Sequence, residues 1–276
     1  MHTLLPERPV SYTDADKEVW ALLYERQLAA VQTFAYAHFE KGLQLLGLTA
    51  TGILNFDVLN KRLYPLTGWN IYAVPGLIPN RAFFELMAFK RFGATTWLRK
   101  WEQLDYLEEP DMFHDVFGHV PLLTDPLITD FLVGLALIAQ RHLDNEAVIE
   151  AIARVYWYTV EFGLVQENGE TKIYGAGILS SVGETKFALS PEANRKPFEL
   201  ERVLASPYIK DKYQELYFVL DSMEQLNDII KQLNQNLPLH EKIPFDAANG
   251  GFCAAGGSPF EPVGTGGDDF QDNRPA

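Results

Sequence analysis

Residues 108–123 read EEPDMFHDVFGHVPLL and place two histidines, His114 and His119, five positions apart in a mostly apolar run. On a straight α-helix, side chains five positions apart diverge by roughly 140° around the axis, so they would not reach one ion. Gly118 loosens the last turn, and Pro121 prevents the helix from continuing. We therefore expect a helix that ends near His119 and lets this histidine swing back beside His114.

A third ligand is expected from the helical pattern YWYTVEFGLV, residues 156–165, which contains Glu161 among apolar and aromatic residues. A buried carboxylate is costly unless it is paired or bound to a metal ion. Two histidines and one carboxylate leave open coordination positions, which is typical of non-haem Fe(II) oxygenases. A catalytic zinc site uses the same ligand types, although the spacing here differs from the HExxH pattern. A metal-free protein in which both histidines only pack is the third interpretation.

The composition excludes several classes of protein. The chain has 276 residues and a formal net charge of −14, with no cluster of basic residues, so we expect neither nucleic-acid binding nor attraction to anionic membranes. The longest apolar run, residues 131–139, is shorter than the roughly 20 residues of a membrane-spanning helix. The N-terminus lacks a signal-peptide pattern, and the single cysteine, Cys253, cannot form an internal disulfide. We expect a cytoplasmic protein.

The order of apolar patterns and chain breakers predicts a mainly α fold of the α+β kind, with a few short strands. We divide the chain into an N-terminal arm (1–15), a central domain (16–244) and a Gly-, Pro- and Asp-rich tail (245–276), for which we expect disorder. Helices are expected over residues 17–48, 56–68, 111–119, 126–142, 144–165 and 211–236, and from Arg81 after a cap at Asn80. Short strands are expected within residues 167–189.

Three stretches make the chain recognisable: EPDMFHDVFGHVPLL, WYTVEFGL and IYGAGILSSVGE. They resemble the pterin-dependent aromatic amino acid hydroxylases, most closely the short bacterial members that act on phenylalanine. The similarity covers roughly residues 65–220. It implies that the central domain is a helical hydroxylase catalytic domain with a few short strands. It also implies that His114, His119 and Glu161 are the catalytic iron ligands.

The resemblance implies a set of substrate-binding residues. Arg99, in WLRKWEQLDY, matches the arginine that pairs with the carboxylate of the amino acid, and Asp111 is placed to support it. A planar guanidinium suits that role because it grips a carboxylate with two parallel hydrogen bonds. The substrate-binding positions implied are Arg99, Pro110, Trp157, Phe162, Gly177, Ser180 and Ser181. The bulky indole of Trp157 is expected to narrow the pocket and to favour phenylalanine.

A second set of residues matches the pterin site of the family. Phe83 matches the aromatic ring that stacks on the pterin. Asp115 stands where the family has a glutamate, and its shorter side chain suits a contact through water. The pterin-binding positions implied are Gly76, Leu77, Ile78, Asn80, Phe83 and Asp115.

The activity implied is phenylalanine 4-monooxygenase, which converts L-phenylalanine to L-tyrosine. It uses O2 and a tetrahydropterin, either tetrahydrobiopterin or a bacterial analogue, at a non-haem Fe(II) centre. The alternatives are a tryptophan hydroxylase of the same family and a zinc-dependent hydrolase with the same ligands. Because neither a regulatory segment nor an apolar heptad is evident, we expect a monomer.

Overall fold

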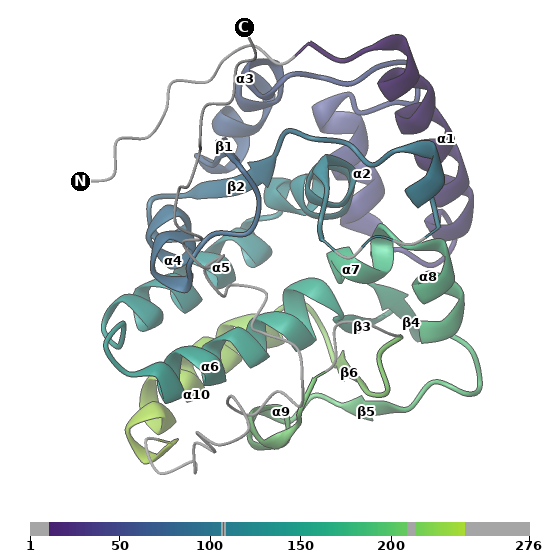
Figure 1. Ribbon diagram of the computed structural model, residues 1–276. Coiled ribbons are helices and arrows are strands. Elements are labelled where there is room, and N and C mark those ends of the chain that lie inside the picture. The colour runs from purple at the N-terminus through teal and green to yellow at the C-terminus, as the bar shows by residue number, and fades with distance from the viewer. Residues whose placement is uncertain (1–10, 106, 108, 209–212, 241–276) are drawn as a thin grey trace, which may run out of the picture.

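Helices dominate the computed structural model, which describes residues 11–240 apart from 106, 108 and 209–212 (Figure 1). The α-helices are α1 Asp14–Val31, α2 Ala37–Leu46, α3 Phe56–Thr67, α4 Asn80–Ala88, α5 Pro126–Gln140, α6 Glu146–Tyr156, α7 Ala176–Leu179, α8 Val182–Ala188, α9 Leu200–Ala205 and α10 Gln225–His240. The 3₁₀ turns are η1 Trp101–Gln103 and η3 Val120–Thr124, and the π-helical turns are η2 His114–His119 and η4 Trp157–Glu161. The strands are β1 Asn70–Val74, β2 Arg91–Thr95, β3 Leu164–Glu167, β4 Glu170–Ile173, β5 Arg195–Pro197 and β6 Tyr217–Leu220. The expected mainly α fold with short strands is confirmed.

The strands form two small sheets. β1 and β2 pair in parallel, while the other sheet has the order β4-β3-β6-β5. β3 and β4 form an antiparallel hairpin whose turn, Asn168-Gly169, has positive φ angles of 54° and 82°. An Asn-Gly pair adopts this left-handed turn readily, and its twist matches that of the strands. β3 begins three residues after Glu161, so the larger sheet holds the end of η4 in place.

The apolar core surrounds α5, which carries eight buried residues on its 15 positions. Both α4 and α10 pack on this helix, and α6 follows it along the chain. Figure 1 shows α5, α6 and α10 together in the lower half of the molecule, with the larger sheet beside them. Since η3 leads directly into α5, the core also anchors the segment that follows His119.

The prediction of a single helix over residues 17–48 is wrong. The structure has two helices there, α1 and α2. The connecting residues pair with β4 instead. The Tyr36 N–H donates to the carbonyl of Ile173 at 2.8 Å, and the Ile173 N–H donates to the carbonyl of Phe34 at 2.8 Å. Tertiary hydrogen bonds to a neighbouring strand therefore override the helical periodicity of the sequence.

Other boundaries also differ from the expectation. Within residues 167–189 only β3 and β4 are strands, because Ser181 caps α8 and the chain from Ala176 onward is helical. Within 211–236, β6 precedes α10, since residues 217–220 pair with β3 and β5. The helix at 56–68 is confirmed as α3, although Pro65 lies inside it. Asn80 is the first residue of α4 and not its cap, because the extended Pro79 occupies that position.

Within the described residues, no single helix is long and apolar enough to cross a bilayer; His114–Thr124 and Pro126–Gln140 pass that test only as a pair bent by 108°. The expected tail and the first ten residues of the expected arm lie outside the described residues.

Gly42 gives the first testable prediction. A Cβ at this position of α2 would lie 2.1 Å from the carbonyl oxygen of Pro121, which is in η3 just after His119. We expect Gly42→Ala to lower the free energy of unfolding by about 2–3 kcal/mol, because backbone atoms must separate to admit the methyl group. Chemical denaturation measures this loss. Gly52→Ala is the matched control, since no atom lies within 4 Å of its Cβ position. Equal stability of the two variants would contradict the prediction.

Candidate metal centre

The two histidines meet because the helix widens between them. His114–His119 forms a π-helical turn, in which hydrogen bonds span five residues, so that side chains five apart share one face. The expected mechanism, a helix that ends at His119, is therefore wrong, and the chain stays helical through Pro121 in η3. Gly118 serves a different purpose from the one expected. A Cβ there would lie 2.9 Å from the carbonyl oxygen of Ala176, so the glycine allows η2 to approach α7.

Glu161 completes a compact cluster of three ligand atoms. It ends η4, a second π-helical turn. The His119 Nε2 atom lies 3.2 Å from His114 Nε2 and 3.2 Å from Glu161 Oε1, and His114 Nε2 lies 3.6 Å from Glu161 Oε2. All three groups offer ligand atoms within 4.8 Å of one another. The structure thus brings together the three side chains that the sequence singles out.

Ser180 fixes the tautomer of His114. The Ser180 hydroxyl donates its hydrogen to the carbonyl of Ala176 at 2.8 Å, so it accepts from His114 Nδ1–H, also at 2.8 Å. This leaves the lone pair on Nε2, which faces the other two ligands. Burial lowers the pKa of His114 to about 4, and the neutral imidazole that results is the form that binds metals.

The carboxyl group of Glu161 has a lowered pKa although most of its side chain is buried. Burial raises the pKa of its carboxyl group, but the electrostatic influence of His119 and His114 and hydrogen bonds from His119 and Tyr156 lower the pKa by more than burial raises it. Tyr156 was not among the expected site residues. Its position five residues before Glu161, the same spacing as between the histidines, is the signal that connects the two in a π-helical turn.

The donor set fits a divalent ion of the first transition series. Ligands at right angles around such an ion, with bonds of about 2.1 Å, lie about 3 Å apart, close to the separations observed here. Two imidazoles and one carboxylate on one side of an ion form the facial triad of non-haem Fe(II) oxygenases. The three residues can therefore hold Fe(II) and leave positions for other molecules.

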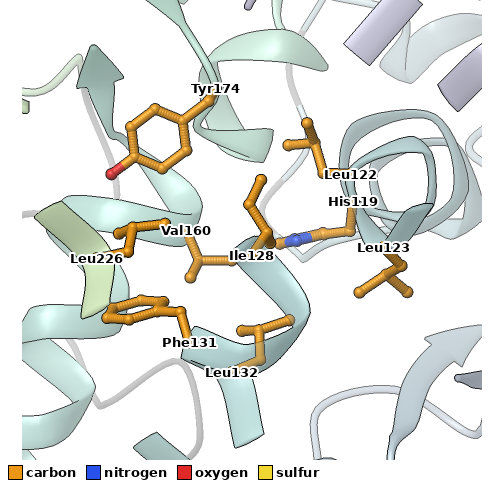
Figure 2. Close-up of a pocket in the computed structure, with 9 residues that line it drawn as sticks. All are labelled: His119, Leu122, Leu123, Ile128, Phe131, Leu132, Val160, Tyr174 and Leu226. Carbon is orange, nitrogen blue, oxygen red and sulfur yellow. The ribbon is translucent and has the colours of Figure 1, made fainter. Parts of the chain in front are cut away.

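Apolar side chains close one side of the metal centre. A cavity of about 10 Å³ lies beside His119. Figure 2 shows the apolar side chains and Tyr174 that surround it. That space is about the size of one water molecule. The ring of Phe92 packs against His119 with 4.9 Å between the ring centroids. Apolar side chains and the Phe92 ring thus pack around the His119 imidazole, and the space that remains there is too small for an aromatic amino acid.

Arg99 and Asp111 form a buried pair near the start of the histidine segment. The guanidinium donates from Nε and from one terminal nitrogen to the two carboxylate oxygens of Asp111, both at 2.8 Å. The same carboxylate accepts from the backbone N–H of Arg99 at 2.9 Å and of His114 at 3.1 Å. Asp111 therefore links the arginine directly to the first metal-binding residue. The remaining guanidinium donors can bind a further anion.

Two aromatic rings, Trp157 and Phe162, pack together close to Glu161 in the sequence. The indole of Trp157 lies 4.7 Å from the ring of Phe162, measured between centroids. A Cβ on Gly177 would lie 2.7 Å from the Phe162 ring, so this glycine allows the ring to lie against α7. Ser181 caps α8 by accepting from the Glu184 N–H at 3.3 Å. Pro110 precedes Asp111 and is half-buried.

The expected pterin residues occupy the loop between β1 and α4, the first turn of α4 and the start of η2. Gly76, Leu77 and Ile78 are half-buried in the loop, and Phe83 packs edge-on against Tyr156 with centroids 5.3 Å apart. The Asn80 amide oxygen is buried and has no hydrogen-bond partner among the described residues. Asp115 accepts from the Thr95 N–H at 2.7 Å, and burial raises its pKa to about 7.

Metal binding should stabilise the fold. Adding Fe(II) anaerobically to chelator-treated protein is expected to raise the Tm by about 5–10 °C at a hundredfold excess over Kd, because the ion binds only the folded state. Calorimetry measures the shift. His119→Ala should abolish it, whereas His142→Ala, outside the cluster, should retain it. An unchanged Tm in the parent protein would contradict metal binding at this site.

Comparison with known proteins gives consistent matches. The sequence profile of the biopterin-dependent aromatic amino acid hydroxylases matches residues 4–250. Phenylalanine-4-hydroxylase of Ralstonia nicotianae is 45% identical over 241 residues, which are 86% of this chain and 75% of the relative. The protein of the same name from Caulobacter vibrioides is 46% identical over 220 residues, 79% of this chain and 74% of the relative.

Solved structures show the same similarity. Phenylalanine hydroxylase of Chromobacterium violaceum with bound Fe(III) aligns with a TM-score of 0.83 and 43% identity, covering 88% of each chain. A second structure of that enzyme, with Fe(III) and 7,8-dihydrobiopterin, aligns with a TM-score of 0.81 and 43% identity over 87% of each chain.

Proposed function

This chain belongs to the biopterin-dependent aromatic amino acid hydroxylases, and we propose on that basis that it is a phenylalanine 4-monooxygenase. It converts L-phenylalanine to L-tyrosine with O2 and a tetrahydropterin at an Fe(II) centre. The convergence of His114, His119 and Glu161 carries this conclusion, since relatives named phenylalanine-4-hydroxylase match most of the chain.

Iron and pterin supply the chemistry that side chains lack: together they activate O2 for insertion into an aromatic ring. His114, His119 and Glu161 would hold the iron. The hydrogen bond from His114 to Ser180 keeps one imidazole lone pair directed at the site, and Tyr156 holds the Glu161 carboxylate. These supporting contacts would keep the three ligand side chains in place around the ion.

Arg99 would bind the carboxylate of phenylalanine. Asp111 occupies part of the guanidinium and fixes its plane, so its free donors have one orientation before the substrate arrives. Such preorganisation lowers the entropy lost when substrate binds. Trp157, Phe162 and Pro110 would enclose the aromatic ring, and Gly177, Ser180 and Ser181 would face the backbone end of the amino acid. Apolar walls around the ring exclude water from the reacting carbon.

The loop of Gly76, Leu77 and Ile78 would hold the pterin, with Phe83 stacked on its ring and Asn80 and Asp115 as polar partners. The buried, unpartnered amide oxygen of Asn80 supports this assignment. A buried acceptor without a donor costs free energy, and an N–H group of a pterin would satisfy it.

The direct test is anaerobic loading with Fe(II), followed by O2, tetrahydrobiopterin and L-phenylalanine, with tyrosine measured by chromatography. We expect tyrosine only when all components are present. Zn(II)-loaded protein should form none, which separates this function from a zinc hydrolase. L-Tryptophan in place of phenylalanine tests the related specificity. Absence of tyrosine from fully loaded, folded protein would overturn the proposal.

A further inference from the structure

The indole N–H of Trp157 has a specific buried partner. Its Nε1–H donates to the side-chain oxygen of Gln214 at 2.8 Å. Trp157 is 7% exposed, and its ring packs against those of Phe162 and Tyr208, each with centroids 4.7 Å away. The two neighbouring rings limit tilting of the indole, and the hydrogen bond fixes its rotation within that plane.

Gln214 is itself held by α8. Its backbone N–H donates to Glu184 at 3.2 Å, and the Tyr217 hydroxyl donates to the same carboxylate oxygen. The ring of Tyr213 stacks on Phe187 of α8, with centroids 5.4 Å apart. Three contacts therefore attach Tyr213, Gln214 and the first residue of β6 to one short helix, and they hold the backbone of Gln214 in place beside the indole.

The same helix is attached to the metal centre. α8 starts at its cap Ser181, and the preceding Ser180 binds His114. Glu184 thus connects two walls of the site through α8. One wall carries Ser180 beside the metal ligand, and the other carries Trp157 beside Phe162.

We propose that Gln214, held by Glu184, is a positioning residue that fixes the indole of Trp157 and thereby sets the preference for phenylalanine over larger aromatic amino acids. This inference rests on the proposed function and deepens it. A pocket wall that can rotate away accepts a larger ring at little cost. A wall held by a buried hydrogen bond does not, because moving it leaves an indole N–H without an acceptor.

Nuclear magnetic resonance of the unmodified, iron-free protein tests the hydrogen bond directly. The indole N–H signal of Trp157 is assigned by its loss in Trp157→Phe. We expect this proton to exchange with solvent at least about 100-fold more slowly than that of Trp101, which is 45% exposed. Gln214→Met keeps the side-chain length but removes the acceptor, so it should abolish most of the protection. This readout does not depend on activity.

Substrate selectivity tests the functional consequence. We expect Gln214→Met to lower the ratio of kcat/KM for phenylalanine to kcat/KM for tryptophan by about 10-fold, mainly through a lower KM for tryptophan, because the loosened indole admits the larger ring. Gln166→Met is the matched control, because Gln166 is an exposed residue of β3, and its selectivity should equal that of the parent. In a Trp157→Phe background, Gln214→Met should cause no further change in the ratio.

The outcomes separate the possibilities. Slow exchange in the parent, lost in Gln214→Met together with selectivity, supports the proposal. Rapid exchange of the Trp157 indole in the parent overturns it even if Gln214→Met fails to fold. Unchanged selectivity after loss of the hydrogen bond, or an equal loss in the Trp157→Phe background, also overturns it. Failure of the proposed function is distinct, since the unmodified enzyme would then form no tyrosine.

Discussion

Tyrosine formation is expected to fall by at least about 1,000-fold in Glu161→Gln, a loss typical of residues that act as one catalytic unit. The substitution keeps the shape of the side chain but removes the negative charge that faces His119 Nε2 at 3.2 Å. A neutral amide is a poor ligand for Fe(II), and it cannot balance the charge of the ion beside two neutral imidazoles. The measurements are tyrosine production and iron content after gel filtration.

The fold of this variant should persist. Glu161→Gln removes both the desolvation cost of the carboxylate and part of its favourable contacts with His119 and Tyr156, so we expect the metal-free variant to unfold at a temperature similar to that of the metal-free parent. Glu170→Gln is the control with the same charge change on an exposed hairpin, and it should retain full activity. Activity within tenfold of the parent in Glu161→Gln would mean that Glu161 is not a metal ligand.

Arg99→Ala is expected to have two separable effects. Affinity for phenylalanine should fall about 100-fold, because truncation of a charged partner in a bidentate contact typically costs that much. Stability should also fall, by about 3 kcal/mol, because Asp111 is fully buried and would lose its ion-pair partner. Steady-state kinetics at varied phenylalanine and chemical denaturation measure the two effects.

A second substitution separates them. Asp111→Asn in the Arg99→Ala background removes the unpaired charge, so stability should largely return while phenylalanine affinity stays low. The double variant still offers an amide oxygen to the backbone N–H of His114, which the carboxylate contacts at 3.1 Å in the parent. Recovery of phenylalanine affinity in the double variant would show that Arg99 acts only through the fold and does not touch substrate.

Much of the helical core can be predicted from the sequence, because segments with apolar periodicity begin there at residues that cap a helix. α5 follows Asp125, whose side chain accepts from the Leu127 N–H, and α6 begins after Asn145, which caps it in the same way. The break between α1 and α2 cannot be predicted in this way. It depends on hydrogen bonds between Tyr36 and Ile173, which are 137 positions apart, and no local pattern encodes that contact.

The metal ligands were predictable, but the way they converge was not. The residue types and their apolar setting indicate His114, His119 and Glu161, whereas a π-helical turn has no periodicity of its own in so short a segment. Arg99 alone reads as a surface residue beside Lys100, and only the family resemblance singles it out. Gln214 and Glu184 carry no local signal, since each acquires its role through contacts between distant segments.

The π-helical turns η2 and η4 restrict where insertions and deletions can occur in the sequence. Deletion of one codon within 115–118 would rotate every later residue of that helix by about 100° relative to the preceding ones, displacing η3 and its contacts with α2. A deletion within 158–160 would likewise rotate the residues after η4 and displace β3. Surface loops can gain or lose residues during evolution, but these two intervals cannot. A homologue whose sequence has a gap in either of these two intervals is therefore expected to lack this metal-dependent activity.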